Sequence, residues 1–135
     1  MGRVTGVYVR ENGVERKVDS DQIYSTIPLT TGEYDEWGNP EEPDVYDRIK
    51  AYAPYENVTA QAYPPLLVIA GYNDSRVQYW DAAKWVARLR RDKTDANLLL
   101  LKTDLGAGHG GMSGRYQGIK DVALEYAFLF RVLGI

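Results

Sequence analysis

The candidate chemistry of this 135-residue chain rests on one aspartate and one histidine, 35 positions apart. Asp74 lies in Gly71-Tyr72-Asn73-Asp74-Ser75-Arg76-Val77, and His109, the only histidine, lies in Gly106-Ala107-Gly108-His109-Gly110-Gly111. A carboxylate beside an imidazole fixes the tautomer of the ring and stabilises the imidazolium that forms when the ring accepts a proton. The pair therefore predicts general-base chemistry, provided that the fold brings the two side chains together.

The elements around the two residues are those of a β-α-β-α unit. The aliphatic runs 66–70 and 98–101 predict parallel strands at 66–70 and 98–102, covered on both faces, and residues 78–92 between them have helical apolar spacing. Loops that leave the carboxyl ends of parallel strands open on the same edge of a sheet. We therefore expect an Asp74 oxygen within about 2.6–3.2 Å of a His109 nitrogen. A final helix, about 115–133, should turn these residues inward: Ile119, Val122, Ala123, Tyr126, Phe130 and Leu133.

The first half of the chain is less regular. Residues 1–26 read as a β-hairpin, with a strand candidate at 4–10, the turn signal Asn12-Gly13 and a return at 14–18. Residues 27–65 predict a long loop with a short helix near 45–51, and loops of this length are usually functional. Two parallel strands cannot form a stable sheet alone. Their neighbours must come from the first 65 residues, from another chain, or from protein beyond this sequence.

The sequence disfavours three other kinds of site. The segment 106–111 satisfies Gly-x-Gly-x-x-Gly, but the dinucleotide site also needs a further strand with an acidic residue about 20 positions on. Ser113 lacks a nucleophile elbow, and capping of the last helix is its plainer role. With one histidine and no cysteine, a zinc site is disfavoured. We therefore expect neither a cofactor nor a metal.

Composition narrows the partners. The net charge of −3 argues against nucleic acid, which calls for a clustered basic face. The basic run 88–91 falls at a helix end, where cations oppose the helix dipole. No apolar run approaches the roughly 20 residues of a membrane helix, so no membrane partner is expected. The absence of cysteine is compatible with a cytoplasmic location, which we predict.

Residues 27–135 resemble the C-terminal part of the catalytic domain of the oligopeptidase B group, in the prolyl oligopeptidase family of serine peptidases. The resemblance covers about 109 of the 135 residues. It implies part of an α/β-hydrolase fold, in which a triad aspartate and histidine follow successive strands. The matching segments are Ile27-Pro28-Leu29-Thr30-Thr31-Gly32-Glu33-Tyr34-Asp35-Glu36-Trp37-Gly38-Asn39-Pro40, Tyr52-Ala53-Pro54-Tyr55-Glu56-Asn57-Val58, Val77-Gln78-Tyr79-Trp80, Ala83-Lys84-Trp85-Val86-Ala87, Gly108-His109-Gly110-Gly111 and Glu125-Tyr126-Ala127-Phe128-Leu129.

The resemblance implies roles for five residues. Asp74 and His109 would be the acid and the base of the triad, and Arg76 would bond the peptide carbonyl next to the cleaved residue. Glu33 and Asp35 fall where the family recognises an arginine or lysine before the scissile bond. Two carboxylates two positions apart in an extended loop can converge on one guanidinium. From the residues alone, a solvated acidic turn remains open for this pair.

The departures from the family leave two hypotheses. The family places its nucleophile, on a Gly-x-Ser-x-Gly turn, before the segment that corresponds to Ile27, and these 135 residues contain no such motif. The hairpin 1–26 has no counterpart that we identify, and the β-propeller of the family is absent. The first hypothesis is a fragment of a serine oligopeptidase that cleaves after arginine or lysine in short peptides once a complete site is assembled. The second is an inactive, self-associating α/β module. We expect a homo-oligomer, or a need for the missing catalytic half.

Overall fold

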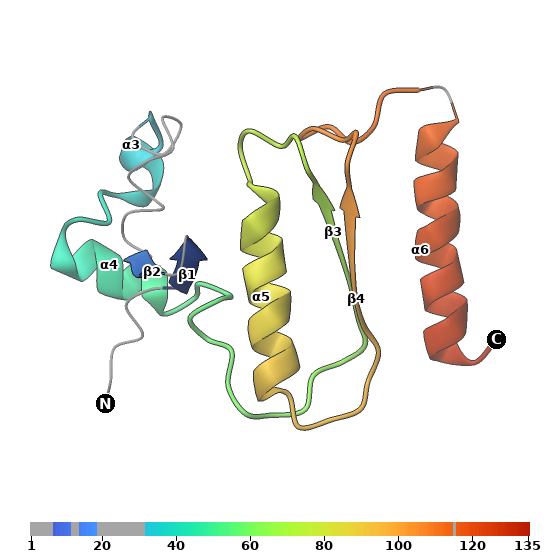
Figure 1. The fold of residues 1–135 in the computed structure, drawn as a ribbon, viewed down its shortest axis with the longest axis horizontal. Coiled ribbons are helices and arrows are strands. Elements are labelled where there is room, and N and C mark those ends of the chain that lie inside the picture. The colour runs from blue at the N-terminus through green and yellow to red at the C-terminus, as the bar shows by residue number, and fades with distance from the viewer. Residues whose placement is uncertain (1–6, 12–13, 19–31, 115) are drawn as a thin grey trace. The chain divides into compact units, whose positions relative to one another are not determined.

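A computed structural model describes residues 7–11, 14–18, 32–114 and 116–135 (Figure 1). The chain divides into two compact units, Met1–Ala53 and Pro54–Ile135, and each is described by itself. In the first unit, β1 (Val7–Glu11) and β2 (Val14–Val18) pair antiparallel, with Val7 opposite Val18 and Glu11 opposite Val14. The antiparallel pairing predicted for the hairpin is present in these two strands. The rest of the predicted segment, residues 1–6, the turn Asn12-Gly13 and residues 19–26, lies outside the described residues.

Two short helices follow in the first unit. The predicted helix near 45–51 is α4 (Pro43–Lys50), and it begins earlier because Pro43 suits the first helical position. The sequence did not predict α3 (Tyr34–Trp37). Gly38 ends α3 with a φ of 90°, and a Cβ there would lie 2.8 Å from Cγ1 of Val45. Since Val45 is only 5% exposed, this turn needs glycine both for its backbone angle and for space.

The second unit contains the predicted β-α-β arrangement. Strands β3 (Leu66–Gly71) and β4 (Leu99–Asp104) pair in parallel, with Leu66 beside Leu99 and Gly71 beside Asp104. Helix α5 (Tyr79–Asp92) connects them and packs on both strands. Its Val86 and Leu89 are 1% and 0% exposed, so the core of this unit lies between α5 and the strands.

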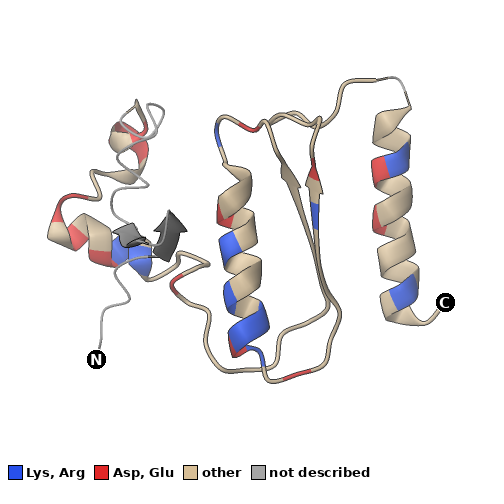
Figure 2. Ribbon diagram, in the orientation of Figure 1, with Lys and Arg blue, Asp and Glu red and all other residues tan. Residues whose placement is uncertain are grey.

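Basic side chains gather toward the C-terminal end of α5 (Figure 2). Arg90 and Arg91 lie in its last turn, where cations interact favourably with the helix dipole. Arg91 also donates to Asp92 at 2.7 Å and 2.8 Å, and the Arg88 guanidinium lies 4.8 Å from the centre of the Tyr55 ring. Arg88 and Arg91 of the basic run therefore have local partners.

Helix α6 (Gln117–Leu133) lies on the opposite side of the strands from α5 (Figure 1). An ion pair connects it to the sheet, with Lys102 Nζ 2.8 Å from Asp121 Oδ1. The prediction that its apolar residues face a core is wrong for this chain, since α6 has no buried residue and Tyr126 is 55% exposed. The physical reason is the orientation of the helix. Leu124, Phe128 and Val132 share the face of Asp121 and are half-buried, whereas the predicted residues lie on another face.

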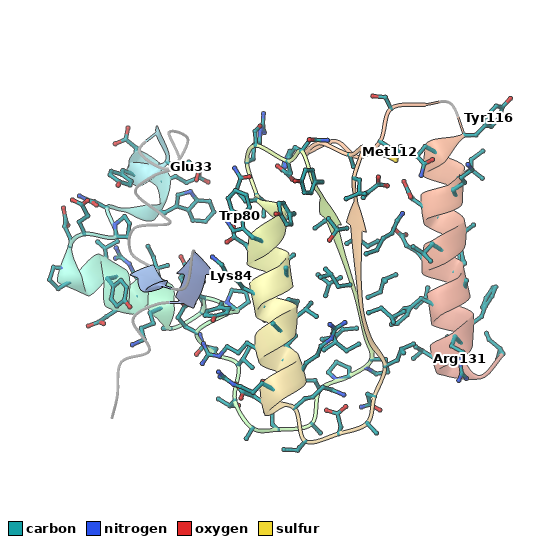
Figure 3. The ribbon with its side chains drawn as sticks, viewed as in Figure 1. Glu33, Trp80, Lys84, Met112, Tyr116 and Arg131 are labelled. Carbon is teal, nitrogen blue, oxygen red and sulfur yellow. The ribbon has the colours of Figure 1, made fainter. Side chains whose placement is uncertain are left out.

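The strand face on the α6 side is uncovered as well. Ile69 pairs with Lys102, and Leu100 lies two positions before Lys102, so both share the face from which Lys102 reaches α6. Ile69 is 45% exposed and Leu100 is 40% exposed. Side chains of α6 and of the strands project into the space between them (Figure 3). Within the described residues, no helix combines the length and the apolar character needed to cross a bilayer.

Candidate functional site

Asp74 is held by the loop between β3 and α5. Its Oδ1 accepts hydrogen bonds from the backbone N–H groups of Arg76, at 2.8 Å, and Val77, at 2.9 Å. The carboxylate therefore folds back over its own loop just before α5 begins at Tyr79. This local closure points its second oxygen, Oδ2, toward the next loop of the sheet edge.

The environment of Asp74 favours its ionised form. Partial burial alone would raise the pKa of this carboxyl group, and its side chain is only 12% exposed. The backbone amides of Val77 and Arg76 and the ring of His109 outweigh that effect, so the pKa of Asp74 lies below its ordinary value. The side chain is a carboxylate at neutral pH, and it can only accept hydrogen bonds.

His109 lies in a tight turn after β4. The N–H of Gly111 donates to the carbonyl of Gly108 at 3.1 Å, and Gly111 has a φ of 86°, which suits glycine. Just before this turn, Ala107 is buried at 4% exposure. The buried alanine anchors the loop, and the glycine turn presents the imidazole, whose side chain is 49% exposed.

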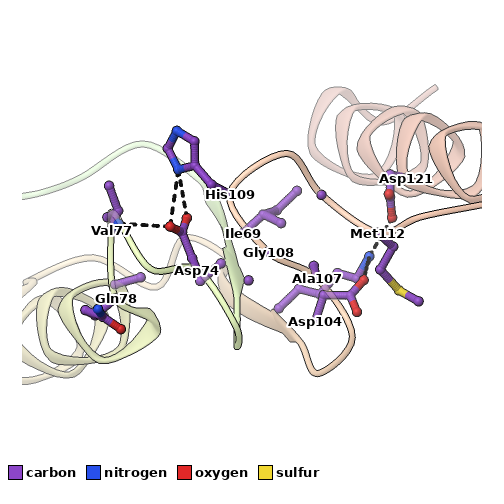
Figure 4. A pocket seen from close by; sticks show the side chains of 15 residues that line it. Ile69, Asp74, Val77, Gln78, Asp104, Ala107, Gly108, His109, Met112 and Asp121 are labelled. Atoms are coloured by element: carbon purple, nitrogen blue, oxygen red, sulfur yellow. Dashed lines mark hydrogen bonds and ion pairs between the residues drawn. The ribbon is translucent and has the colours of Figure 1, made fainter.

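The two loops bring Asp74 and His109 into contact. His109 Nδ1 lies 3.2 Å from Oδ1 and 3.1 Å from Oδ2 of Asp74 (Figure 4). The proximity predicted from the topology is therefore confirmed. Because an ionised carboxylate has no proton to donate, Nδ1 must carry the hydrogen. The neutral ring then keeps its basic lone pair on Nε2, the atom that can take a proton from a nucleophile.

A pocket of about 290 Å³ lies beside this pair. Sequence reasoning missed two residues that line it, Lys102 and Asp121, which pair with each other. The available signal was a charged residue at the end of the aliphatic run 98–101. The other lining residues come from both strands, both loops and the start of α5: Ile69, Ala70, Gly71, Asp74, Val77, Gln78, Ala82, Asp104, Ala107, Gly108, His109, Gly111 and Met112.

The remaining predicted residues lie outside this contact. Arg76 has an exposed side chain, and its backbone N–H binds Asp74. Glu33 and Asp35 are exposed in the first unit, at the cap and in the first turn of α3. The extended loop expected around them is wrong, and residues two apart on a helix do not face each other. Their part in substrate binding stays a prediction.

The structure also bears on Ser113, on the glycine segment 106–111 and on a metal site. Ser113 does not cap the last helix, because α6 begins at Gln117 with Tyr116 as its cap residue. The glycine segment 106–111 therefore ends several residues before the helix, unlike a dinucleotide loop, which leads directly into one. Among the described residues, no three His, Asp or Glu side chains are grouped closely enough to hold a metal ion.

Comparisons with known proteins identify the family of the chain. Residues 8–135 match the prolyl oligopeptidase family. The chain is 51% identical over 118 residues to Protease 2 of Moraxella lacunata, covering 87% of this chain and 17% of that protein. It is 52% identical over 110 residues to Dipeptidyl aminopeptidase BI of Pseudoxanthomonas mexicana, covering 82% and 15%. The structure of oligopeptidase B from Leishmania major superimposes with a TM-score of 0.77 at 44% identity, covering 83% and 16%.

Fold and site together define a part of an α/β-hydrolase catalytic domain. The chain belongs to the prolyl oligopeptidase family. Its match begins at residue 8 and so includes most of the N-terminal segment 1–26, for which inspection of the sequence suggests no counterpart. The chain spans about one sixth of the length of these relatives, with 17% and 15% of the two proteins and 16% of the solved chain covered.

Proposed function

We propose that this chain carries the aspartate–histidine part of a serine peptidase site. Asp74 holds His109 with Nδ1 protonated, and Nε2 accepts the proton of a serine hydroxyl and later passes it to the leaving amine. The observation that carries the proposal is the contact of His109 Nδ1 with Asp74 at 3.1 Å, at the edge of a parallel sheet. The serine and the donors of the oxyanion hole come from polypeptide outside these 135 residues, in which no Gly-x-Ser-x-Gly occurs.

The proposed substrates are short peptides cleaved after arginine or lysine. The exposed carboxylates Glu33 and Asp35 give this proposal its electrostatic basis. Because α3 does not turn them to the same side, a basic substrate must reach around the helix start to contact both. Arg76, exposed two residues after Asp74, is the proposed donor to the substrate carbonyl.

We also propose that the uncovered face of the second unit receives more polypeptide. The exposed apolar residues Ile69 and Leu100 lie on that face, beside Lys102. Its proposed occupant is either the missing catalytic half or a second copy of the chain, and the latter is the alternative function, an inactive self-associating module. A cytoplasmic location remains part of the proposal.

The tautomer of His109 tests the proposed role of Asp74. As the only histidine, it gives one pair of imidazole ¹⁵N signals in a labelled sample. At alkaline pH, where the ring is neutral, we expect the Nδ1–H form to dominate, because the carboxylate accepts only from that nitrogen. In Asp74→Asn the ratio of Nδ1–H to Nε2–H should fall by about tenfold or more, since a bond to a charged group contributes roughly 1.5–3 kcal/mol.

Asp81→Asn is the matched control, because this carboxylate lies in the first turn of the neighbouring α5. It should leave the ratio unchanged. A ring that is mainly Nε2–H in the unmodified chain would contradict the proposed pairing.

A further inference from the structure

The loop of His109 is joined to the loop of Asp74 by more than the catalytic contact. The side-chain amide of Asn73 donates to the carbonyl of Leu105 at 3.0 Å, and its backbone N–H donates to the carbonyl of Ala107 at 2.9 Å. One residue, directly before Asp74, thus binds both sides of Gly106. In addition, the backbone N–H of Tyr72 donates to the carbonyl of Asp104 at 2.8 Å.

The approach of the two loops is as close as the backbone allows. A Cβ on Gly71 would lie 2.8 Å from the carbonyl oxygens of both Ala107 and Gly108, nearer than real Cβ atoms come. Gly108 is the residue directly before His109, and its own Cβ would meet the carbonyl oxygen of Asn73 at 3.7 Å. The position of the His109 turn is therefore set by the backbone of residues 71–73.

We propose that Asn73 is a positioning residue for the Asp74–His109 pair. Its two bonds fix the position of residues 105–107 relative to the Asp74 loop, and His109 follows two residues later. The inference rests on the proposed function for its catalytic meaning, although the geometry that it concerns belongs to this chain alone. The side chain of His109 is 49% exposed, so the position of its ring depends on the loop that carries it.

The structure offers a closely matched control for this residue. Asn97 is also an exposed asparagine whose side-chain amide donates to a distant loop carbonyl, that of Tyr63, at 2.7 Å. That bond spans 34 positions of the chain and the Asn73 bond spans 32. Asn97 precedes β4, whereas Asn73 follows β3, so the two bonds lie at opposite ends of the parallel strands. Loss of either bond should affect stability to a similar degree.

The experiment compares Asn73→Ala with Asn97→Ala in the full chain. Circular dichroism and urea unfolding first establish that each variant folds, and imidazole ¹⁵N spectra at alkaline pH then give the tautomer ratio of His109. In N73A we expect the ratio of Nδ1–H to Nε2–H to fall by about two- to tenfold, as the loss of one hydrogen bond allows. In N97A the ratio should stay at the value of the unmodified chain.

Asn73→Ser provides a second variant if N73A does not fold, because it removes the amide without adding charge or an empty space as large. It should lower the ratio in the same direction. An unchanged ratio in a folded Asn73 variant, or an equal fall in N97A, would overturn the inference. These outcomes leave the proposed function intact, whereas a mainly Nε2–H ring in the unmodified chain would remove the catalytic pair itself.

Discussion

The carboxylate of Asp74 is stabilised both by backbone amides and by the ring of His109. Backbone amides of its own loop bind Oδ1, and the ring of His109 contacts both oxygens. The amide bonds keep the carboxylate charged and oriented even when the ring is absent from its contact position. A carboxylate prepared in this way needs little reorganisation when the neighbouring ring becomes an imidazolium, which is the electrostatic requirement of a triad acid.

Two other individual residues, Glu33 and Asp35, give a testable proposal about substrate preference. An arginine-containing peptide should bind the chain more tightly than the matching norleucine peptide, and binding should weaken as salt rises. Because both carboxylates are exposed, the dissociation constant should be roughly millimolar to high micromolar. Calorimetry or NMR titration of both peptides at two salt concentrations provides the measurement.

The double replacement of Glu33 by Gln and Asp35 by Asn should abolish the preference for arginine. Asp74→Asn is the control and should preserve it, since Asp74 already binds two backbone amides and His109. Equal binding of the arginine and norleucine peptides to the unmodified chain would refute the assignment.

Asp95 connects the C-terminal end of α5 to the segments that precede β3 and β4. Asp95 accepts hydrogen bonds from Lys93 Nζ, from the backbone N–H of Tyr63 and from that of Asn97, each at 2.7 Å. The Lys93 ammonium is the largest influence, and with the two amides it lowers the pKa of Asp95 to about 2. The cluster closes the end of the sheet that lies away from the site.

This lowered pKa predicts a pH-dependent contribution to stability. The carboxylate of Asp95 has a lower pKa in the folded chain than the value of about 3.9 expected when unfolded, so its contribution is complete above that value. The contribution is lost as the pH falls from about 4 toward 2. Urea unfolding should show a free-energy difference between the unmodified chain and Asp95→Asn that shrinks over this range. A difference that stays constant with pH would contradict the prediction.

The sequence predicts the elements that have a clear apolar run or a regular apolar spacing. The aliphatic runs before Gly71 and before Asp104 indicate buried strands, and the alternation that places Val86 and Leu89 on one face indicates a helix. Helix α3 has only four residues, too few to show a period. For α6 the predicted inward face is wrong, because Leu124, Phe128 and Val132 are half-buried while the predicted residues are exposed. An apolar pattern on a helix does not say which face is covered.

For the site as well, some features follow from the sequence and others do not. Topology alone predicts that Asp74 and His109 meet, because both follow parallel strands on one edge. The bonds of Asn73 to the carbonyls of Leu105 and Ala107 were not predicted, since a side chain that binds backbone leaves no periodic signal in the sequence. The ion pair of Lys102 with Asp121 likewise depends on how α6 is set against the sheet.

The exposed apolar side chains of α6 should affect how the whole molecule behaves in solution. Val122, Leu129 and Leu133 are 48%, 47% and 66% exposed on α6, and such surfaces favour association. We therefore expect light scattering of the chain to show a dimer or larger species at concentrations well above micromolar. The variant with Leu129→Glu and Leu133→Glu should shift the chain toward monomer, while Glu125→Ala on the same helix should not. A monomer at all concentrations would contradict this expectation.

The central claim is that the Asp74–His109 pair of this chain can serve a peptidase. The most direct measurement grafts the chain into Protease 2 of Moraxella lacunata, in place of the 118-residue segment to which it is 51% identical. Hydrolysis of a peptide that unmodified Protease 2 cleaves should be retained by the graft. His109→Ala in the graft should lower the rate on the order of 10⁶-fold, the scale of a lost triad histidine. A folded graft without activity, or a graft whose activity survives His109→Ala, would contradict the account.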